Sequence, residues 1–109
     1  MDIQAQVAQI VAEAQQAAYK AASDHIQKHG EDWYCGFAWC TVYEKGSTKL
    51  GRALIKAGFS KSYSGGLQLW NPSGLGTQSM SVKEVGAEAA AQVLRDRLGV
   101  KAYAGSRAD

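Results

Sequence analysis

Residues 2–29 constrain the fold of this chain more than any other segment, because their apolar side chains recur at steps of three and four. The repeating positions are Ile3, Val7, Ile10, Val11, Ala14, Ala18, Ala21, Ala22, His25 and Ile26. This spacing predicts one amphipathic helix, with Asp2 as the N-cap and Gly30 as the C-terminal stop. At 1.5 Å per residue, the helix would be roughly 40 Å long.

A helix of that length is long for the chain that contains it. The 109 residues are typical of a single domain, for which a radius of gyration of roughly 13 Å is expected. Either the helix kinks or its outer end packs on another subunit. We expect the second, with residues 1–30 forming a homodimer contact and residues 31–109 forming an α/β core.

The clearest predicted strand is residues 33–44, WYCGFAWCTVYE, which are rich in aromatic and β-branched side chains. Successive side chains of a strand point to opposite faces. One face would carry Trp33, Cys35, Phe37, Trp39, Thr41 and Tyr43, and the other Tyr34, Gly36, Ala38, Cys40 and Val42. We expect a helix against the small residues, and the aromatic residues either in the core or lining a pocket. A Cys35–Cys40 disulfide is not expected, since the two side chains face opposite ways.

The remaining elements complete an α+β fold. Residues 47–58 predict a short helix capped by Ser47 or Thr48, residues 60–66 a polar linker, and residues 67–70 a strand. Residues 81–98 predict a helix that opens with a capping box of Ser81 and Glu84, and residues 100–104 a last strand before a polar tail. The predicted order is α-β-α-β-α-β, with a three-stranded sheet and a long N-terminal helix.

The loop of residues 71–80, between the second strand and the last helix, is the main candidate site. Its hydrogen-bonding side chains are Asn71, Ser73, Thr77, Gln78 and Ser79. Free N–H groups and the positive dipole end of the next helix would attract an anion. With Trp39 or Trp70 for stacking and Arg52 or Arg107 for charge, we expect a nucleotide or another phosphorylated small molecule. The alternative is an ordinary loop before a well-capped helix.

Nucleic-acid binding is a further alternative. Lys49, Arg52 and Lys56 would share one helix face and could hold phosphates, although a net charge of +2 is low for an extended nucleic-acid groove. Residues 74–98 also resemble, in pattern, the end of double-stranded RNA-binding domains, where a G-x-G turn precedes an alanine-rich helix. That family carries several lysines at the helix start, whereas here Lys83 is followed at once by Glu84.

Other classes of function find little in the sequence. It has no nucleophile-elbow, H-E-x-x-H or paired-carboxylate motif, so we expect a non-enzymatic protein without a cofactor. His25 and His29 have a spacing that can hold zinc, but without a C-x-x-C motif we expect them to be helix-end histidines. The chain has no run of about 18 apolar residues, the length needed to span a membrane, and no signal-peptide pattern begins it. We therefore expect a cytoplasmic protein.

Several short segments resemble a group of small uncharacterised proteins encoded by tailed bacteriophages. These segments are residues 35–39 (CGFAW), 70–72 (WNP), 76–80 (GTQSM), 83–87 (KEVGA) and 104–107 (AGSR) with Asp109. The resemblance covers Trp33 to the C-terminus and leaves out the first helix. It implies no established activity, but it places the protein in the cytoplasm of an infected bacterium. There, a binder or a protein-interaction module that inhibits a host factor is expected rather than a metabolic enzyme.

Overall fold

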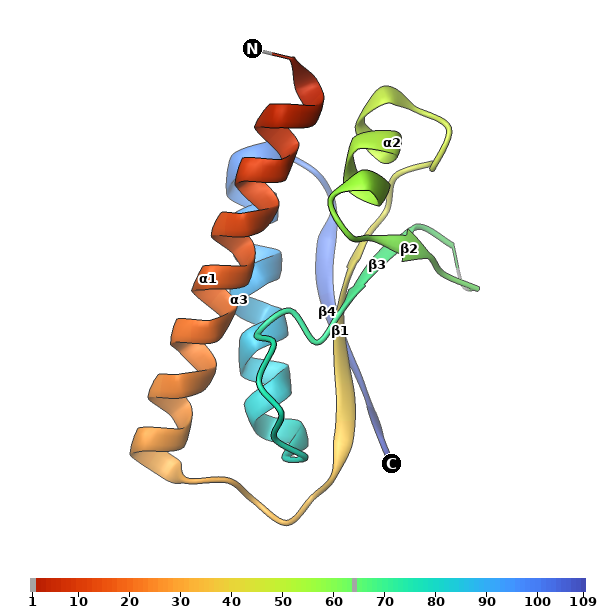
Figure 1. Ribbon diagram of the computed structural model, residues 1–109. Helices are drawn as coiled ribbons and strands as arrows, with labels where there is room; N and C mark the ends of the chain where they lie inside the picture. Colours follow the sequence, from red (N-terminus) through yellow and green to blue (C-terminus); the bar gives the residue numbers. More distant parts are fainter. Residues whose placement is uncertain (1, 64) are drawn as a thin grey trace.

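The computed structural model describes residues 2–63 and 65–109 and has an α+β fold built on one sheet (Figure 1). In chain order the elements are α1 (Ile3–His29), β1 (Gly36–Val42), α2 (Lys49–Lys56), β2 (Ser60–Lys61), β3 (Leu67–Trp70), α3 (Met80–Leu98) and β4 (Ala102–Ala108). The sheet is antiparallel, in the order β2-β3-β1-β4. Figure 1 shows α1 and α3 side by side on one face of it. We call the other face the open face.

The predicted α+β class and the long N-terminal helix are confirmed, but the three-stranded sheet is wrong, because the sheet has four strands. The extra strand, β2, lies in the segment predicted to be a linker and pairs Ser60 with Gln68. Ser64 of that segment lies outside the described residues. β4 also runs on to Ala108 through the predicted polar tail, since every residue from Ala102 to Ala108 pairs with β1.

The length of α1 is accommodated within one chain. The molecule measures 41 × 28 × 19 Å, with a radius of gyration of 13.5 Å, and α1 packs along α3. The buried side chains of α1 are Val7, Ile10, Val11, Ala14, Ala18 and Ala22. Because the molecule is elongated, a helix of 27 residues needs neither a kink nor a second subunit. The homodimer stays a prediction.

The helix starts agree with the sequence in two cases of three. The Asp2 carboxylate accepts a hydrogen bond from the Ala5 N–H at 2.8 Å, and the Thr48 hydroxyl accepts one from the Gly51 N–H at 2.9 Å, as N-caps do. The predicted Ser81/Glu84 capping box is wrong. The α3 helix begins at Met80, with Ser79 in the N-cap position.

The capping box fails because α3 begins before Ser81 and both residues of the box have other partners. The Ser81 hydroxyl is hydrogen-bonded to the Ser79 hydroxyl at 3.2 Å. The Met80 N–H donates to the Tyr34 carbonyl at 2.8 Å, which ties the start of α3 to the chain just before β1. The Glu84 carboxylate accepts from the Ser106 hydroxyl at 2.7 Å instead of turning back to the helix start. Tertiary contacts therefore decide how α3 begins.

The two sides of β1 differ as its sequence predicts. Ala38, Cys40 and Val42 are buried against the helices, whereas Phe37 is exposed and Trp39 is half-buried on the open face. The alternative that the aromatic residues form the core is therefore wrong. Both cysteines are free, and burial raises the pKa of the Cys40 thiol to about 12. None of the described helices has the length and apolar character that crossing a membrane requires.

Candidate functional site

Three aromatic rings meet on the open face where β1 and β3 pair. Trp39 lies directly opposite Trp70 in the strand register, and their ring centroids are 5.0 Å apart. The rings of Phe37 and Trp70 form a T-shaped pair, with centroids 6.4 Å apart. Trp70 is 49% exposed and Phe37 is 37% exposed, so this aromatic cluster of Phe37, Trp39 and Trp70 offers ring surface to solvent. Flat ligands stack on such surfaces.

Gly105 of β4 fixes the position of Trp39. A Cβ atom at Gly105 would lie 2.6 Å from Nε1 of the Trp39 indole and 2.7 Å from its Cε2. The indole therefore rests on the backbone of the neighbouring strand, an arrangement in which an aromatic ring covers a strand glycine. Sequence reasoning missed Gly105, because nothing local to it shows which strand it would pair with.

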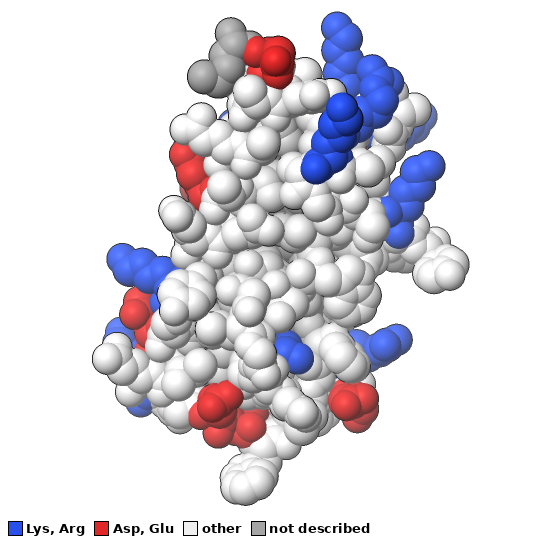
Figure 2. All heavy atoms as spheres, in the orientation of Figure 1, with Lys and Arg blue, Asp and Glu red and all other residues white. Residues whose placement is uncertain are grey.

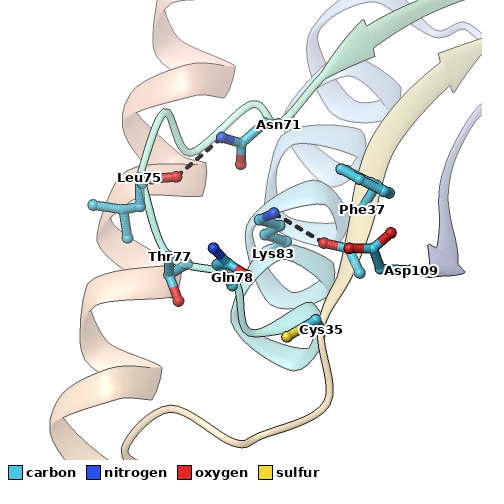
Figure 3. A pocket seen from close by; sticks show the side chains of 10 residues that line it. Cys35, Phe37, Asn71, Leu75, Thr77, Gln78, Lys83 and Asp109 are labelled. Carbon is cyan, nitrogen blue, oxygen red and sulfur yellow. Dashed lines mark hydrogen bonds between the residues drawn. The ribbon is translucent and has the colours of Figure 1, made fainter.

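A pocket of about 340 Å³ adjoins the aromatic cluster at the point where the chain leaves β3 (Figure 3). Its lining residues are Cys35, Gly36, Phe37, Asn71, Leu75, Gly76, Thr77, Gln78, Lys83 and Asp109. Of the predicted site residues, the structure brings Asn71, Thr77 and Gln78 to this pocket. Ser73 and Ser79 are buried and do not line it.

The pocket is a gap in the hydrogen-bond ladder of β1. On one side of the gap the Asn71 N–H donates to the Ala38 carbonyl at 3.0 Å, and on the other the Gly36 N–H donates to the Gln78 carbonyl at 3.2 Å. Between these two bonds residues 72–77 swing away from β1. The Gly36 carbonyl, which a neighbouring strand would otherwise pair, accepts from Nζ of Lys83 at 2.9 Å.

Among the described residues that line the pocket, Lys83 is the cation and Asp109 the acid. Its ammonium lies 5.2 Å from the centroid of the Phe37 ring, and Figure 3 shows it between the loop and β1. An ammonium has three donors, of which the Gly36 carbonyl uses one. Sequence reasoning missed Lys83 as a site residue. A signal was present, since a lysine in the first turn of a helix opposes the helix dipole and so suggests another role.

The polar side chains of the loop mainly hold its shape. Asn71 has a positive φ of 42°, and its side-chain amide donates to the Leu75 carbonyl at 3.0 Å. The Ser73 hydroxyl donates to Asn71 at 3.3 Å and accepts from the Leu75 N–H at 3.2 Å. Thr77 donates to Glu31 and accepts from the Ser79 N–H. These bonds form the wall of the pocket and leave Gln78 as an exposed side chain on its rim.

The N-terminus of α3, where a phosphate was expected, already holds a carboxylate of the chain. The Ser79 hydroxyl donates to Oδ1 of Asp32 at 2.7 Å, and the Asp32 N–H donates to the Ser79 hydroxyl at 3.3 Å. Hydrogen bonds from Ser79 and then Ser81 hold the pKa of Asp32 below its usual value. A ligand phosphate at this helix end would have to displace Asp32 or be repelled by it.

The two predicted arginines lie in different places. Arg107 is on the open face, where its guanidinium carbon is 5.9 Å from the centroid of the Phe37 ring. Arg52 lies on α2, beside the N-terminal end of α1, and donates to the Ser47 carbonyl. The loop is at the opposite end of α1, where Thr77 contacts Glu31, so Arg52 is not part of this site.

The histidines do not extend the site. The rings of His25 and His29 lie side by side on α1, with centroids 4.9 Å apart. Within residues 2–63 and 65–109, no three side chains of the His, Cys, Asp and Glu types gather as a metal ion would need.

Comparisons with protein-family models, curated proteins and solved structures give no match to this chain. The resemblance to bacteriophage proteins stays a prediction. The geometry of the open face and of the pocket therefore carries the functional argument.

Proposed function

We propose that the protein is a non-enzymatic binding protein for a flat, anionic small molecule, with a nucleotide as the simplest example. The observation that carries this proposal is the exposed aromatic cluster beside a pocket that holds Lys83. The base would stack on Trp70 and Trp39. The phosphate would bond to the free donors of Lys83 and to the Arg107 guanidinium.

This arrangement differs from the one expected from the sequence in where the phosphate lies. The phosphate is assigned to Lys83 because Asp32 occupies the N-terminus of α3. The pocket also holds the Asp109 carboxylate, so the assignment needs Lys83 and Arg107 together to offset that charge. The pocket volume of about 340 Å³ lies at the lower end of the range for small-molecule sites. A pocket of this size suits the phosphate end of a nucleotide while the base stays on the open face.

Tryptophan fluorescence tests the proposal. The chain has three tryptophans, of which Trp33 is 98% exposed and lies outside the site. Trp33→Phe therefore leaves the fluorescence of Trp39 and Trp70 alone to report on binding. In that background, titration with purine and pyrimidine nucleotides is expected to quench Trp39 and Trp70 and to raise the melting temperature. Trp70→Ala and Lys83→Gln are each expected to weaken the binding.

A matched control is Lys49→Gln on α2, which removes the same charge away from the site and is expected to leave the affinity unchanged. If no nucleotide changes either the fluorescence or the melting temperature, the proposal is wrong. It is also wrong if Lys49→Gln and Lys83→Gln weaken binding equally, since the effect would then be one of overall charge.

We also propose that the protein acts in the cytoplasm, and in that of the infected bacterium if the bacteriophage resemblance holds. Its free thiols, Cys35 and Cys40, fit a reducing compartment.

One observation favours a second candidate function, a protein-interaction module that inhibits a host factor. Trp33 and Tyr34 precede β1 and are 98% and 60% exposed, and exposed aromatic residues of this kind often anchor protein interfaces. Capture of a stoichiometric partner that is lost with Trp33→Ala and retained with Trp70→Ala would support this candidate. The opposite pattern would assign the partner to the open face instead.

A further inference from the structure

The open face carries aromatic rings well beyond the aromatic cluster. Tyr43, just after β1, and Tyr103 of β4 are 56% and 52% exposed, and their ring centroids are 6.0 Å apart. Phe37 and Tyr43 are six positions apart, a distance of about 20 Å along an extended strand. A single nucleotide stacked on the cluster would leave the tyrosine pair uncovered.

Cations accompany both ends of this aromatic surface. Arg107 pairs with Phe37 in the strand register, and Tyr103 pairs with Thr41, so alternate residues of β4 point to the open face. Lys101, which precedes β4 and is exposed, follows the same alternation next to Tyr43, whose N–H donates to the Lys101 carbonyl at 2.9 Å. No residue within the described strands β1, β3 or β4 with open-face alternation is acidic, and Asp109, which follows β4 in the same alternation, places one carboxylate at the pocket end.

We propose that the open face binds single-stranded nucleic acid along β1. Bases would stack on the aromatic cluster and on the Tyr43/Tyr103 pair, while phosphates would contact Lys101, Arg107 and Lys83. This inference rests on the proposed function, because the nucleotide site forms one end of the longer surface. Aromatic platforms with flanking cations are the usual means of holding unpaired bases.

Charge and shape favour this occupant over the others. A duplex hides its base faces in its own stack, so a flat row of rings would gain little from it. A second copy of this chain, stacked open face to open face, would bring Lys83, Lys101 and Arg107 of each copy against a face on which Asp109 is the carboxylate that the described pocket lining supplies, so cations would outnumber acids. A single strand supplies both base faces and negative charge.

The basic surface in Figure 2 is a different one. Lys and Arg side chains gather at the upper right, at the end of the molecule that carries α2 in Figure 1. Lys49, Arg52 and Lys56 lie on α2 and are exposed, but none of the ring contacts among the described residues involves α2. They provide a charge-matched control for the open face.

The experiment measures oligonucleotide binding by fluorescence in the Trp33→Phe protein. The affinity for thymidine homopolymers is expected to rise from the mononucleotide to about four nucleotides, near the lower limit for single-strand binding domains, and then to level off. Three phosphate contacts predict a slope of about −2 for the logarithm of the binding constant against that of salt concentration, at about −0.7 per contact.

Two substitutions separate the ends of the surface. Lys101→Gln is expected to reduce the salt slope by about 0.7, whereas Lys49→Gln is expected to leave it unchanged. Tyr43→Ala is expected to weaken tetranucleotide binding about 5- to 150-fold, the range that loss of one base stack produces. The melting temperature of each variant shows that it remains folded.

The outcomes distinguish this inference from the proposed function. If mononucleotides bind but longer strands bind no more tightly, the single-strand inference is wrong and the proposed function stands. If neither binds, both are wrong. The inference is also overturned if an abasic polymer binds as tightly as an oligonucleotide. A concentration-dependent dimer that shields Trp39 and Trp70 from a quencher would overturn it too, by assigning the open face to a second copy.

Discussion

A single missing side chain at Gly51 decides how α2 packs against the turn before it. A Cβ atom at this position would lie 1.9 Å from the Lys45 carbonyl oxygen, which is backbone and has little freedom to move. Alanine favours a helix over glycine by about 1 kcal/mol, but forcing an extra methyl group into a packed site costs about 1–3 kcal/mol. The contact distance indicates that the steric cost wins.

We therefore predict that Gly51→Ala lowers the free energy of unfolding by up to about 2 kcal/mol, which is the steric cost less the gain in helix propensity, as measured by urea denaturation. Gly76→Ala is the matched control, because nothing lies within 4 Å of its Cβ position, and it should change stability by less than about 0.5 kcal/mol. A stabilising Gly51→Ala would show that the turn before α2 adjusts freely.

The ionised Asp32 carboxylate is predicted to stabilise the junction between α1 and α3. Hydrogen bonds from Ser79 and Ser81 hold its folded pKa below its usual value, so its contribution is present above the unfolded pKa and is lost as the pH falls through the folded pKa. Asp32→Asn should melt at a lower temperature than the parent protein at pH 7, and this difference should shrink below about pH 4. Asp24→Asn, on the exposed side of α1, controls for the change of charge.

At the scale of elements, helix starts show which local signals the fold uses. The Thr48 side chain caps α2, so Thr48→Ala is expected to destabilise the protein by about 1 kcal/mol. Glu84→Ala should leave the start of α3 intact, because Glu84 contacts Ser106 of β4. Denaturation of both variants checks this ranking, and a larger loss for Glu84→Ala would restore the capping box, which needs a glutamate or glutamine at this position, as the start of α3.

The elements that the sequence predicts are those whose side chains repeat with a regular period. The α1 stripe and the strand Leu67–Trp70 were predicted correctly because burial of one face imposes that period. β2 and the last half of β4 were not predicted. They are polar or small in sequence and are strands only because their backbones pair with β3 and β1.

The candidate site also contains residues that a local pattern predicts and residues that depend on distant partners. Asn71, Thr77 and Gln78 belong to a loop that its residue types mark as functional, and the structure places them on one pocket. Lys83 and Gly105 act across elements far apart in sequence, so no local pattern could assign their partners. Asp32 likewise contacts Ser79 from a distant part of the sequence. Because its carboxylate lies at the N-terminus of α3, the proposed phosphate position differs from the one expected from the sequence.

At the scale of the whole molecule, α1 is part of the core and not an appendage. The bacteriophage resemblance begins at Trp33, yet buried α1 residues such as Val7 and Val11 share the hydrophobic core with Leu54 and Leu94. A chain that starts at residue 31 would expose that side of α3 to water. We predict that this shortened chain lacks a cooperative thermal transition, as followed by circular dichroism. If the shortened chain folds, α1 is an accessory helix and not part of the core.

The predicted homodimer is a separate question of assembly. Tyr19 is a large exposed side chain of α1, at 55%. Sedimentation of the parent protein and of Tyr19→Glu would test a contact through this helix. A dimer that is unaffected by Tyr19→Glu would move the interface away from this part of α1.

The gap in the β1 ladder has a consequence for how tightly any anion can be held. Lys83 supplies the donor that a neighbouring strand would have given to the Gly36 carbonyl. An anion that draws the ammonium away takes a hydrogen bond from the backbone, and part of the binding free energy then goes into loosening the end of β1. Ligand binding would then appear as faster hydrogen exchange of backbone amides near Gly36. Re-forming the hydrogen bond between Lys83 and the Gly36 carbonyl would favour release of the anion.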